Sequence, residues 1–252
     1  MQKNQFTESE IPFQTLEQFG LTHEMIEDLP TRVINDILEG RRTPVLPIQI
    51  KDEDGAIVRS RTRIAFVRKD DGAVDVLFYP MLQEADLAQF KEQEREQLEQ
   101  GKCILAVVNG KDGIPVHSFV QLDLQTKQVL SAPTQVIGRN LQLVSEDFHL
   151  SSAEVNSLKN GDTVTFAREE DDDAISVGID LNERTGIRLA PGDAKMWSEQ
   201  RNRDWDKYTF GVYGCWVMDD AGNLDYVNEE DYTEELWNEQ RKAGMRSMGR
   251  TR

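Results

Sequence analysis

Three stretches of the chain share one pattern of polar and apolar positions. In each, a polar-faced helical segment ends at a glycine and is followed by a run of β-branched and other apolar residues. The glycines are Gly40, Gly101 and Gly161, about sixty residues apart, which is a spacing typical of internal repeats. Glycine is expected just past a helix end because it adopts the left-handed conformation without a Cβ penalty. Ser151 followed by Glu154 predicts a capping box at the start of the third helix.

The second halves of the copies also resemble one another. Copies two and three contain a Leu/Ile-Asp-Leu segment around Asp123 or Asp180, a polar turn, and a strand-like run that ends in Ala-Pro. Copy one is longer, with strand-like runs at 63–68 and 74–80 around an Asp-Asp-Gly turn, which favours a hairpin. We expect both aspartates to point away from the core and to cap the turns that follow. For copy one, a helix–glycine–strand junction of the kind found in any α+β protein is an open alternative.

The chain after residue 192 has a different composition, because all four tryptophans lie there. Runs 210–218 and 224–227, separated by a short polar turn, predict a hairpin, and residues 229–242 predict a final helix. The basic residues from 241 to 252 are expected to be disordered. We predict a contact surface from exposed aromatic residues of this region; its candidates are Trp205, Trp216 and Trp237.

These patterns predict an α+β fold in which tandem α-β-β-β repeat units pack in series and a small aromatic-rich element follows. The predicted division has four parts. Residues 1–80 hold the helical N-terminus and the first unit, 81–149 the second unit and a connector, 150–192 the third unit, and 193–252 the tryptophan-rich element with its basic tail. The connector at 134–149 has no role that its sequence predicts.

Composition narrows the classes of protein to consider. The 252 residues are 38% hydrophobic and 30% charged, with a formal net charge of −17. Repeat cores would be thin, so neighbouring units should pack on each other. Acidity works against non-specific binding to nucleic acid or to an anionic membrane, and no apolar run has spanning length. Cys103 and Cys215 are far apart and fit buried thiols of a reducing compartment, so a cytoplasmic location is expected.

Enzyme motifs are not found in the sequence. It has neither a phosphate-binding Gly-rich loop followed by Lys-Ser/Thr nor a dinucleotide-binding Gly-x-Gly-x-x-Gly. The histidines are scattered, without metal-ligand spacing. A nucleophile pair of Cys103 and His117 is a weaker interpretation than a core cysteine near an exposed histidine. We therefore expect a protein without enzymatic activity, metal or cofactor.

The strongest basic feature is a set of five arginines near copy one. Arg59, Arg61 and Arg63 share one face of a predicted strand, because side chains alternate with a period of two. Arg41 and Arg42 lie at the exit of the preceding helix. These residues are our candidate contact patch for phosphates or for an acidic protein. The competing interpretation is that they pair internally with the abundant Asp and Glu residues.

Residues from about 13 to 142 resemble a domain family of unknown function found in proteins from conjugative and mobilisable elements of gut anaerobic bacteria. The resemblance depends on four segments: 40–48, 63–68, 75–80 and 119–140. Copy three, at about 150–192, is similar to a related family of short repeats. The resemblance implies an accessory protein of a mobile element and carries no catalytic residues with it. Residues 193–252 match no family known to us.

The function predicted from these observations is that of a non-enzymatic cytoplasmic scaffold or interaction protein of a mobile genetic element. It would bind another protein through the surfaces of its repeat units. One alternative is a nucleic-acid-binding accessory of element transfer or maintenance that uses the arginine stripe. Another is an acidic decoy that mimics nucleic acid and captures a basic host protein. A protein partner is expected first, nucleic acid is the alternative, and no membrane is expected.

Overall fold

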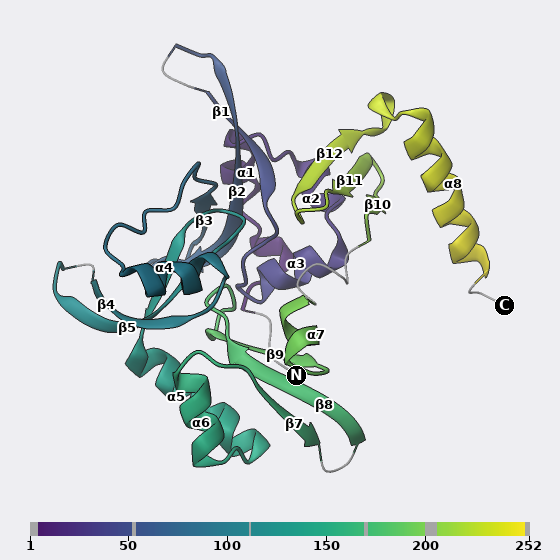
Figure 1. Ribbon diagram of the computed structural model, residues 1–252. Helices are drawn as coiled ribbons and strands as arrows, with labels where there is room; N and C mark the ends of the chain where they lie inside the picture. Colours follow the sequence, from purple (N-terminus) through teal and green to yellow (C-terminus); the bar gives the residue numbers. More distant parts are fainter. Residues whose placement is uncertain (1–4, 52–53, 111, 169–170, 200–205, 250–252) are drawn as a thin grey trace. The chain divides into compact units, whose positions relative to one another are not determined.

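The computed structural model describes residues 5–51, 54–110, 112–168, 171–199 and 206–249 (Figure 1). In this part of the chain, twelve strands form four three-stranded antiparallel sheets, and each sheet follows chain order. The predicted α+β class with repeated helix-and-sheet units is therefore confirmed. Each of the four predicted segments contains one sheet, and the four-part division itself stays a prediction.

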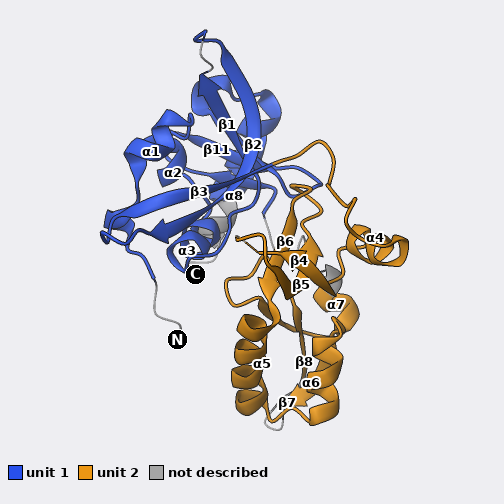
Figure 2. Cartoon of the chain, turned by 90° about the vertical axis from the view of Figure 1, so that its left-hand side faces the viewer, with its two compact units in different colours: residues 1–80, 205–252 blue, residues 81–204 orange. Residues whose placement is uncertain are grey.

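The chain forms two compact units (Figure 2). Unit 1 contains residues 1–80 together with 205–252, and unit 2 contains residues 81–204. Unit 1 is thus built from both ends of the sequence, while unit 2 is one continuous segment. No helix in the described ranges is long and apolar enough to cross a membrane.

Unit 1 has two sheets and a helical N-terminal part. Its elements are η1 (Glu8–Glu10), α1 (Phe13–Gln18), α2 (His23–Glu27), α3 (Thr31–Leu38), β1 (Leu46–Lys51), β2 (Ile57–Arg68), β3 (Val74–Pro80), β10 (Tyr208–Phe210), β11 (Gly214–Met218), β12 (Leu224–Asn228), η2 (Glu229–Asp231) and α8 (Glu234–Gly249). One apolar core joins the two chain segments. Leu16 and Val33 from the helices pack in the same cluster as Trp216 and Leu224 from the last sheet.

Unit 2 contains the second and third repeats. Its elements are α4 (Glu92–Glu99), β4 (Ile104–Asn109), β5 (Pro115–Leu122), β6 (Val129–Pro133), α5 (Thr134–Phe148), α6 (Ser152–Lys159), β7 (Val164–Arg168), β8 (Asp171–Ile179), β9 (Ile187–Pro191) and α7 (Ala194–Glu199). The two sheets share a core in which Phe119 of β5 clusters with Val177 of β8. The two repeats therefore stabilise each other, as thin repeat cores require.

The three glycines that mark the repeats have the predicted conformation. Gly40, Gly101 and Gly161 have φ values of 77°, 74° and 88°, in the left-handed region. Gly161 has a second role, since an added Cβ would lie 2.2 Å from the carbonyl oxygen of Cys103. The end of α6 thus lies against the backbone just before β4. This close approach between the two repeats needs glycine for space as well as for backbone conformation.

The prolines that close the repeats occupy equivalent places in their sheets. Each ends a third strand and lies opposite a residue of the second strand; the pairs are Thr62 with Pro80, Ser118 with Pro133, and Ile175 with Pro191. Proline has no backbone N–H to donate, so it is tolerated at a strand end. The register of copy one thus matches that of the other two, although its second strand is longer.

The repeat aspartates cap their turns as predicted, but they do not point away from the core. Asp123 and Asp180 are both buried. Their Oδ1 atoms accept hydrogen bonds from the backbone N–H of Gln125 and of Asn182, each at 3.1 Å. The Asp180 carboxylate also lies 3.3 Å from Nε of Arg188. The outward orientation was wrong because each side chain folds back over its own turn, which satisfies the carboxylate inside the unit.

The connector without a predicted role is the 15-residue helix α5. Ile137 and Leu141 on its inner face are buried in the core shared by the two sheets of unit 2. Its C-cap, His149, adopts the left-handed conformation with φ 53°. The connector therefore contributes to the packing of repeats two and three against one another.

The C-terminal element contains the predicted hairpin and aromatic cluster. β11 pairs with β12, from Gly214 opposite Asn228 to Met218 opposite Leu224. The final helix begins later than expected, at Glu234 after the 3-10 turn η2, and it continues to Gly249. The expectation of disorder from residue 241 was thus wrong as far as Gly249, because residues 240–243, Gln-Arg-Lys-Ala, are good helix formers that extend the helix.

Candidate functional site

The arginine stripe is divided among different environments. Arg59, Arg61 and Arg63 lie at alternate positions of β2, as the predicted shared face requires. Nη2 of Arg61 donates to both carboxylate oxygens of Asp225 on β12, at 2.8 and 2.7 Å. Nη1 of Arg63 donates to the carbonyl oxygen of Thr43 at 2.7 Å. Two of the three strand arginines therefore have partners inside unit 1.

The helix-exit arginines have local partners as well. Nη1 of Arg41 lies 3.2 Å from Asp36, and its Nη2 lies 2.7 Å from Glu39. The guanidinium of Arg42 lies over the ring of Tyr79, 4.1 Å from the centroid. Internal pairing, the competing interpretation of the stripe, thus describes Arg41 and Arg61.

Arg59 differs from the rest of the stripe. It is exposed on the outer part of the β1–β2 hairpin, opposite Gln49. Among the residues that the structure describes, we find no ion pair or hydrogen bond to its guanidinium. The five arginines therefore do not form one uniform basic patch, and Arg59 has the most accessible charge among the three on β2.

The three candidate tryptophans also differ in their exposure to solvent. Trp216 is completely buried, and its Nε1 donates to the carbonyl oxygen of Met25 at 2.9 Å. It cannot belong to a contact surface, because β11 turns it into the core of unit 1. Trp237 is 36% exposed near the start of α8. Trp205 lies outside the described residues.

Trp237 lies at one end of a row of neighbouring aromatic rings. The rings of Tyr208 and Phe210 on β10 lie 6.2 Å apart, and Phe210 lies 6.0 Å from Tyr232. Tyr232 in turn lies 5.1 Å from Trp237. Burial raises the pKa of the Tyr232 hydroxyl to about 12, so this ring is neutral at physiological pH. We call these four residues the aromatic row.

A buried carboxylate that the sequence patterns do not reveal joins the two ends of the chain. Asp28, at the end of α2, is 4% exposed. It accepts hydrogen bonds from three successive backbone N–H groups: Val212 at 2.6 Å, Tyr213 at 2.9 Å and Gly214 at 2.8 Å. The hydroxyl of Tyr226 donates a fourth, at 2.6 Å. Successive N–H groups of this kind form a concave anion-binding site, which here is filled by a side chain of the same unit.

Two glycines make this arrangement possible. A Cβ on Gly211 would lie 2.0 Å from the Asp28 carboxylate, and one on Gly214 would lie 2.5 Å from the carbonyl oxygen of Val227. The pKa of the Tyr226 hydroxyl is raised mainly by burial and, to a smaller extent, by its hydrogen bond to Asp28. The Gly-x-x-Gly spacing of 211–214 is the only local signal of the site, and it does not reveal which acid fills it.

The first hairpins of repeats one and two expose apolar side chains. On the β1–β2 hairpin these are Ile50, Ile57 and Val58. On β4, an edge strand of its sheet, they are Leu105 and Val107. Ile57 is 59% and Val107 54% exposed, which is far more than a core strand allows. We call these five residues the hairpin patches.

The described part of the chain does not place the candidate nucleophile Cys103 opposite His117, and it contains no cluster of metal ligands. Burial raises the pKa of Cys103 to about 12, so its thiol is not a nucleophile at neutral pH. Cys103 comes just before Ile104, which pairs with Val120 in the β4–β5 ladder. His117 pairs with Val107, several positions further along, so the thiol and the imidazole are not cross-strand neighbours. No group of three or more His, Cys, Asp or Glu residues in the described ranges has the geometry of a metal site.

Comparison with known proteins gives one match. Residues 6–89 match the model of a family described as "Protein of unknown function (DUF4099)". The expected relationship to a domain family of unknown function is thus confirmed for this segment, which contains the N-terminal helices and the β1–β3 sheet. No curated protein and no solved structure matches the chain. The match assigns no activity to any residue.

Proposed function

We propose that this protein is a non-enzymatic interaction protein that binds another protein through the surfaces of its repeat units. The observation that carries the proposal is the pair of hairpin patches. They lie on corresponding hairpins of the first two repeats, where a repeat architecture places an interaction surface. Within each patch two exposed apolar side chains share one face, Ile50 with Val58 on the first hairpin and Leu105 with Val107 on β4, and such groups favour protein binding more than isolated side chains do.

The β4 patch adds backbone groups to the apolar side chains. β4 lies at the edge of the order β4-β5-β6, and residues 103–109 carry no charge. Natural edge strands are commonly protected by charged residues, by proline or by a covering element. An uncharged edge strand with exposed Leu105 and Val107 suits the addition of an extended segment from a partner.

The setting of this binding is also part of the proposal. The resemblance of residues 13–142 to a domain family from mobile elements, together with the similarity of residues 150–192 to a related family of short repeats, supports a role in element transfer, maintenance or interference with the host. A protein of this kind would act in the cytoplasm, where the two thiols, both free, would stay reduced.

The alternatives receive less support. A nucleic-acid-binding role depends on the arginine stripe, in which Arg41 and Arg61 are already paired with carboxylates. A decoy role depends on the net charge of −17, which by itself does not specify a partner. Neither alternative accounts for the exposed apolar side chains of the hairpin patches.

Affinity capture with matched variants tests the proposal. The tagged full chain, a Leu105→Ser/Val107→Ser variant and an Ile57→Ser/Val58→Ser variant are incubated with lysate of the native host. A protein retained by the full chain should be lost with at least one hairpin variant and kept by the control Leu143→Ser, which changes an exposed leucine of α5. That protein, purified, should bind the full chain directly. Equal retention by all four proteins would reject the hairpin patches as the binding surface.

A further inference from the structure

We propose that the aromatic row, on the outer face of the β10–β12 sheet and the first turn of α8, is a docking site for a basic protein segment. An Arg or Lys side chain of the partner would stack on these rings. The surface belongs to the C-terminal element and shares no residue with the hairpin patches, so it is independent of the proposed function above.

The two faces of this sheet have different environments. Trp216, Met218 and Leu224 point from one face into the core of unit 1. Tyr208 and Phe210 lie opposite Val217 and Cys215, on the other face. Among the described elements, η2 and the first turn of α8 contribute Tyr232 and Trp237 to this outer face.

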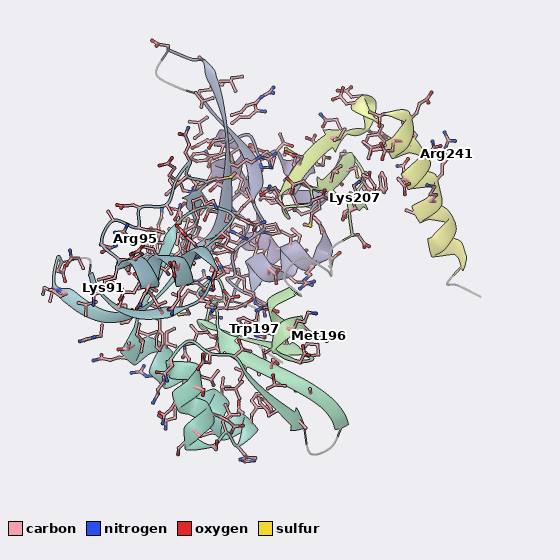
Figure 3. The ribbon with its side chains drawn as sticks, viewed as in Figure 1. Lys91, Arg95, Met196, Trp197, Lys207 and Arg241 are labelled. Carbon is pink, nitrogen blue, oxygen red and sulfur yellow. The ribbon has the colours of Figure 1, made fainter. Side chains whose placement is uncertain are left out.

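The helix that follows covers little of this face. Leu236 of α8 is buried, whereas residues 241–244 are all exposed, so the helix is attached by its first turn. In Figure 1, α8 leads away from the sheet, and Figure 3 shows Arg241 further along this helix. Tyr208, Phe210 and Tyr232 are only half-buried, and Trp237 is exposed. The row is therefore an apolar surface that the protein's own described residues leave accessible.

The charge around the row identifies the kind of partner. From Tyr208 to Gln240 the sequence contains nine carboxylates and no basic residue; one of the nine, Asp225, is paired with Arg61, and Lys207 directly precedes this range. Those nearest to the row in sequence are exposed; they are Glu229, Glu230, Asp231, Glu234 and Glu235. The row connects directly to them, because the hydroxyl of Tyr208 donates to Glu235 at 3.2 Å. A face that combines rings and carboxylates is complementary to a cation, while it repels phosphate and an acidic protein.

One cation of the protein itself shows how the rings accept such a group. Nζ of Lys207 lies over the ring of Tyr208, 5.3 Å from its centroid, within the range of a cation–π contact. Lys207 directly precedes β10, as Figure 3 shows. Phe210, Tyr232 and Trp237 have no cation over their rings among the described residues. These three rings are open to a partner's basic side chains.

Fluorescence anisotropy with two labelled peptides tests the proposal. The probe is a 12-residue Gly/Ser peptide with four arginines, and the negative control carries four glutamates in their place. The full chain should bind the arginine peptide and not the glutamate peptide. Trp237→Leu keeps apolar area but removes the ring, and should weaken binding about threefold; Tyr208→Leu/Trp237→Leu should weaken it about tenfold. Unchanged binding by the ring variants, or no binding to the full chain, would overturn the proposal.

Two controls separate this surface from general acidity and from self-association. Glu230→Gln/Glu234→Gln should weaken peptide binding at least threefold. Glu92→Gln/Glu96→Gln removes equal charge from exposed positions of α4 and should leave binding within twofold. Equal weakening of peptide binding in the two double variants would indicate nonspecific electrostatic attraction and would overturn the proposed site. Sedimentation equilibrium of the full chain and of Trp237→Leu completes the test, since a dimer lost in the variant would make a second copy the occupant.

Failure of this test and failure of the proposed function are distinguishable. Ile57→Ser/Val58→Ser and Leu105→Ser/Val107→Ser change only the hairpin patches, so both should bind the arginine peptide like the unchanged chain. Peptide binding lost in these variants would contradict a site confined to the aromatic row. Unfolding curves of all variants, recorded alongside, should differ little from that of the unchanged chain except at Tyr208, whose hydroxyl bonds Glu235.

Discussion

The hydroxyl of Tyr226 donates a 2.6 Å hydrogen bond to the carboxylate of Asp28, 198 residues earlier in the chain. This contact joins the end of α2 to β12 inside unit 1. The family match ends at residue 89, yet the core to which its helices belong also contains Trp216 and Leu224. The folding unit of the matched segment therefore includes the C-terminal element.

Removing the Asp28 carboxylate should destabilise unit 1 strongly. Asp28→Ala leaves three backbone N–H groups and the Tyr226 hydroxyl without their acceptor in a buried site. Hydrogen bonds to a charged group contribute roughly 1.5–3 kcal/mol each, and they are not additive, so we expect a loss of about 3–5 kcal/mol. Urea unfolding followed by tryptophan fluorescence measures the change, because Trp216 lies in this core.

The matched control is Asp220→Asn, which changes an exposed aspartate in the β11–β12 turn. It should shift the free energy of unfolding by less than about 0.5 kcal/mol. Asp28→Asn keeps one acceptor oxygen and should fall between the control and Asp28→Ala. Similar stability of Asp28→Ala and Asp220→Asn would contradict a structural role for the buried carboxylate.

The sequence predicted features that depend on neighbouring residues. Glycine after a helix, Asp-Gly in a turn and Ser151 with Glu154 are local signals, and the structure contains each of them. Asp28 gives no such signal, because its partners lie about 185 residues away. Its environment depends on which loop the fold places beside α2, and a single sequence does not contain that information.

Gly161→Ala should destabilise unit 2 much more than a glycine substitution at an open turn. The new Cβ would lie 2.2 Å from the carbonyl oxygen of Cys103, in addition to the strain of φ +88°. Gly113→Ala is the control, since φ is +72° there and nothing lies within 4 Å. We expect about 1 kcal/mol for the control and at least about 3 kcal/mol for Gly161→Ala in thermal unfolding. Equal losses would show that α6 can move away from β4 without cost.

The aromatic and arginine candidates show a second limit of sequence reasoning. Alternation along a strand correctly placed Arg59, Arg61 and Arg63 on one face of β2. It did not show that β12, from the other end of the chain, brings Asp225 to Arg61. Trp216 was assigned to a surface for the same reason, since the helices that bury it are distant in sequence.

The Arg61–Asp225 pair should contribute modestly to stability. The two side chains are 31% and 48% exposed, and exposed pairs contribute about 0.2–1 kcal/mol. A double-mutant cycle with Arg61→Gln and Asp225→Asn should therefore give a coupling free energy in that range at low salt and less at 0.5 M salt. Arg59→Gln should leave stability unchanged. A coupling near zero at low salt would mean that the pair is not maintained in solution.

The two thiols should resist modification until the protein unfolds. Burial raises the pKa of Cys103 to about 12 and that of Cys215 to about 11, so both thiols are protonated at pH 8. Because the thiolate is the reactive form, a disulfide reagent should label neither cysteine rapidly in the folded protein and both in 6 M guanidinium chloride. Gly161→Ala should accelerate labelling of Cys103 and leave Cys215 slow, since the substitution disturbs only unit 2. Rapid labelling of Cys215 in the unchanged protein would contradict its burial beneath the aromatic row.

Acid should weaken the start of α6 through a single carboxylate. Hydrogen bonds from the Ser151 hydroxyl and from its backbone N–H, both 2.7 Å, lower the pKa of Glu154 below its ordinary value of 4.5. A carboxyl whose pKa is lower in the folded state stabilises the protein above its unfolded pKa, and this contribution is lost as the pH falls through the lowered value. Glu154→Gln should therefore flatten the decrease in unit 2 stability between about pH 5 and pH 3, while the control Leu143→Ser, which changes an exposed leucine of α5 and removes no carboxylate, should keep it. Thermal unfolding across this pH range measures both, and parallel curves for the unchanged protein and Glu154→Gln would show that the capping box does not titrate.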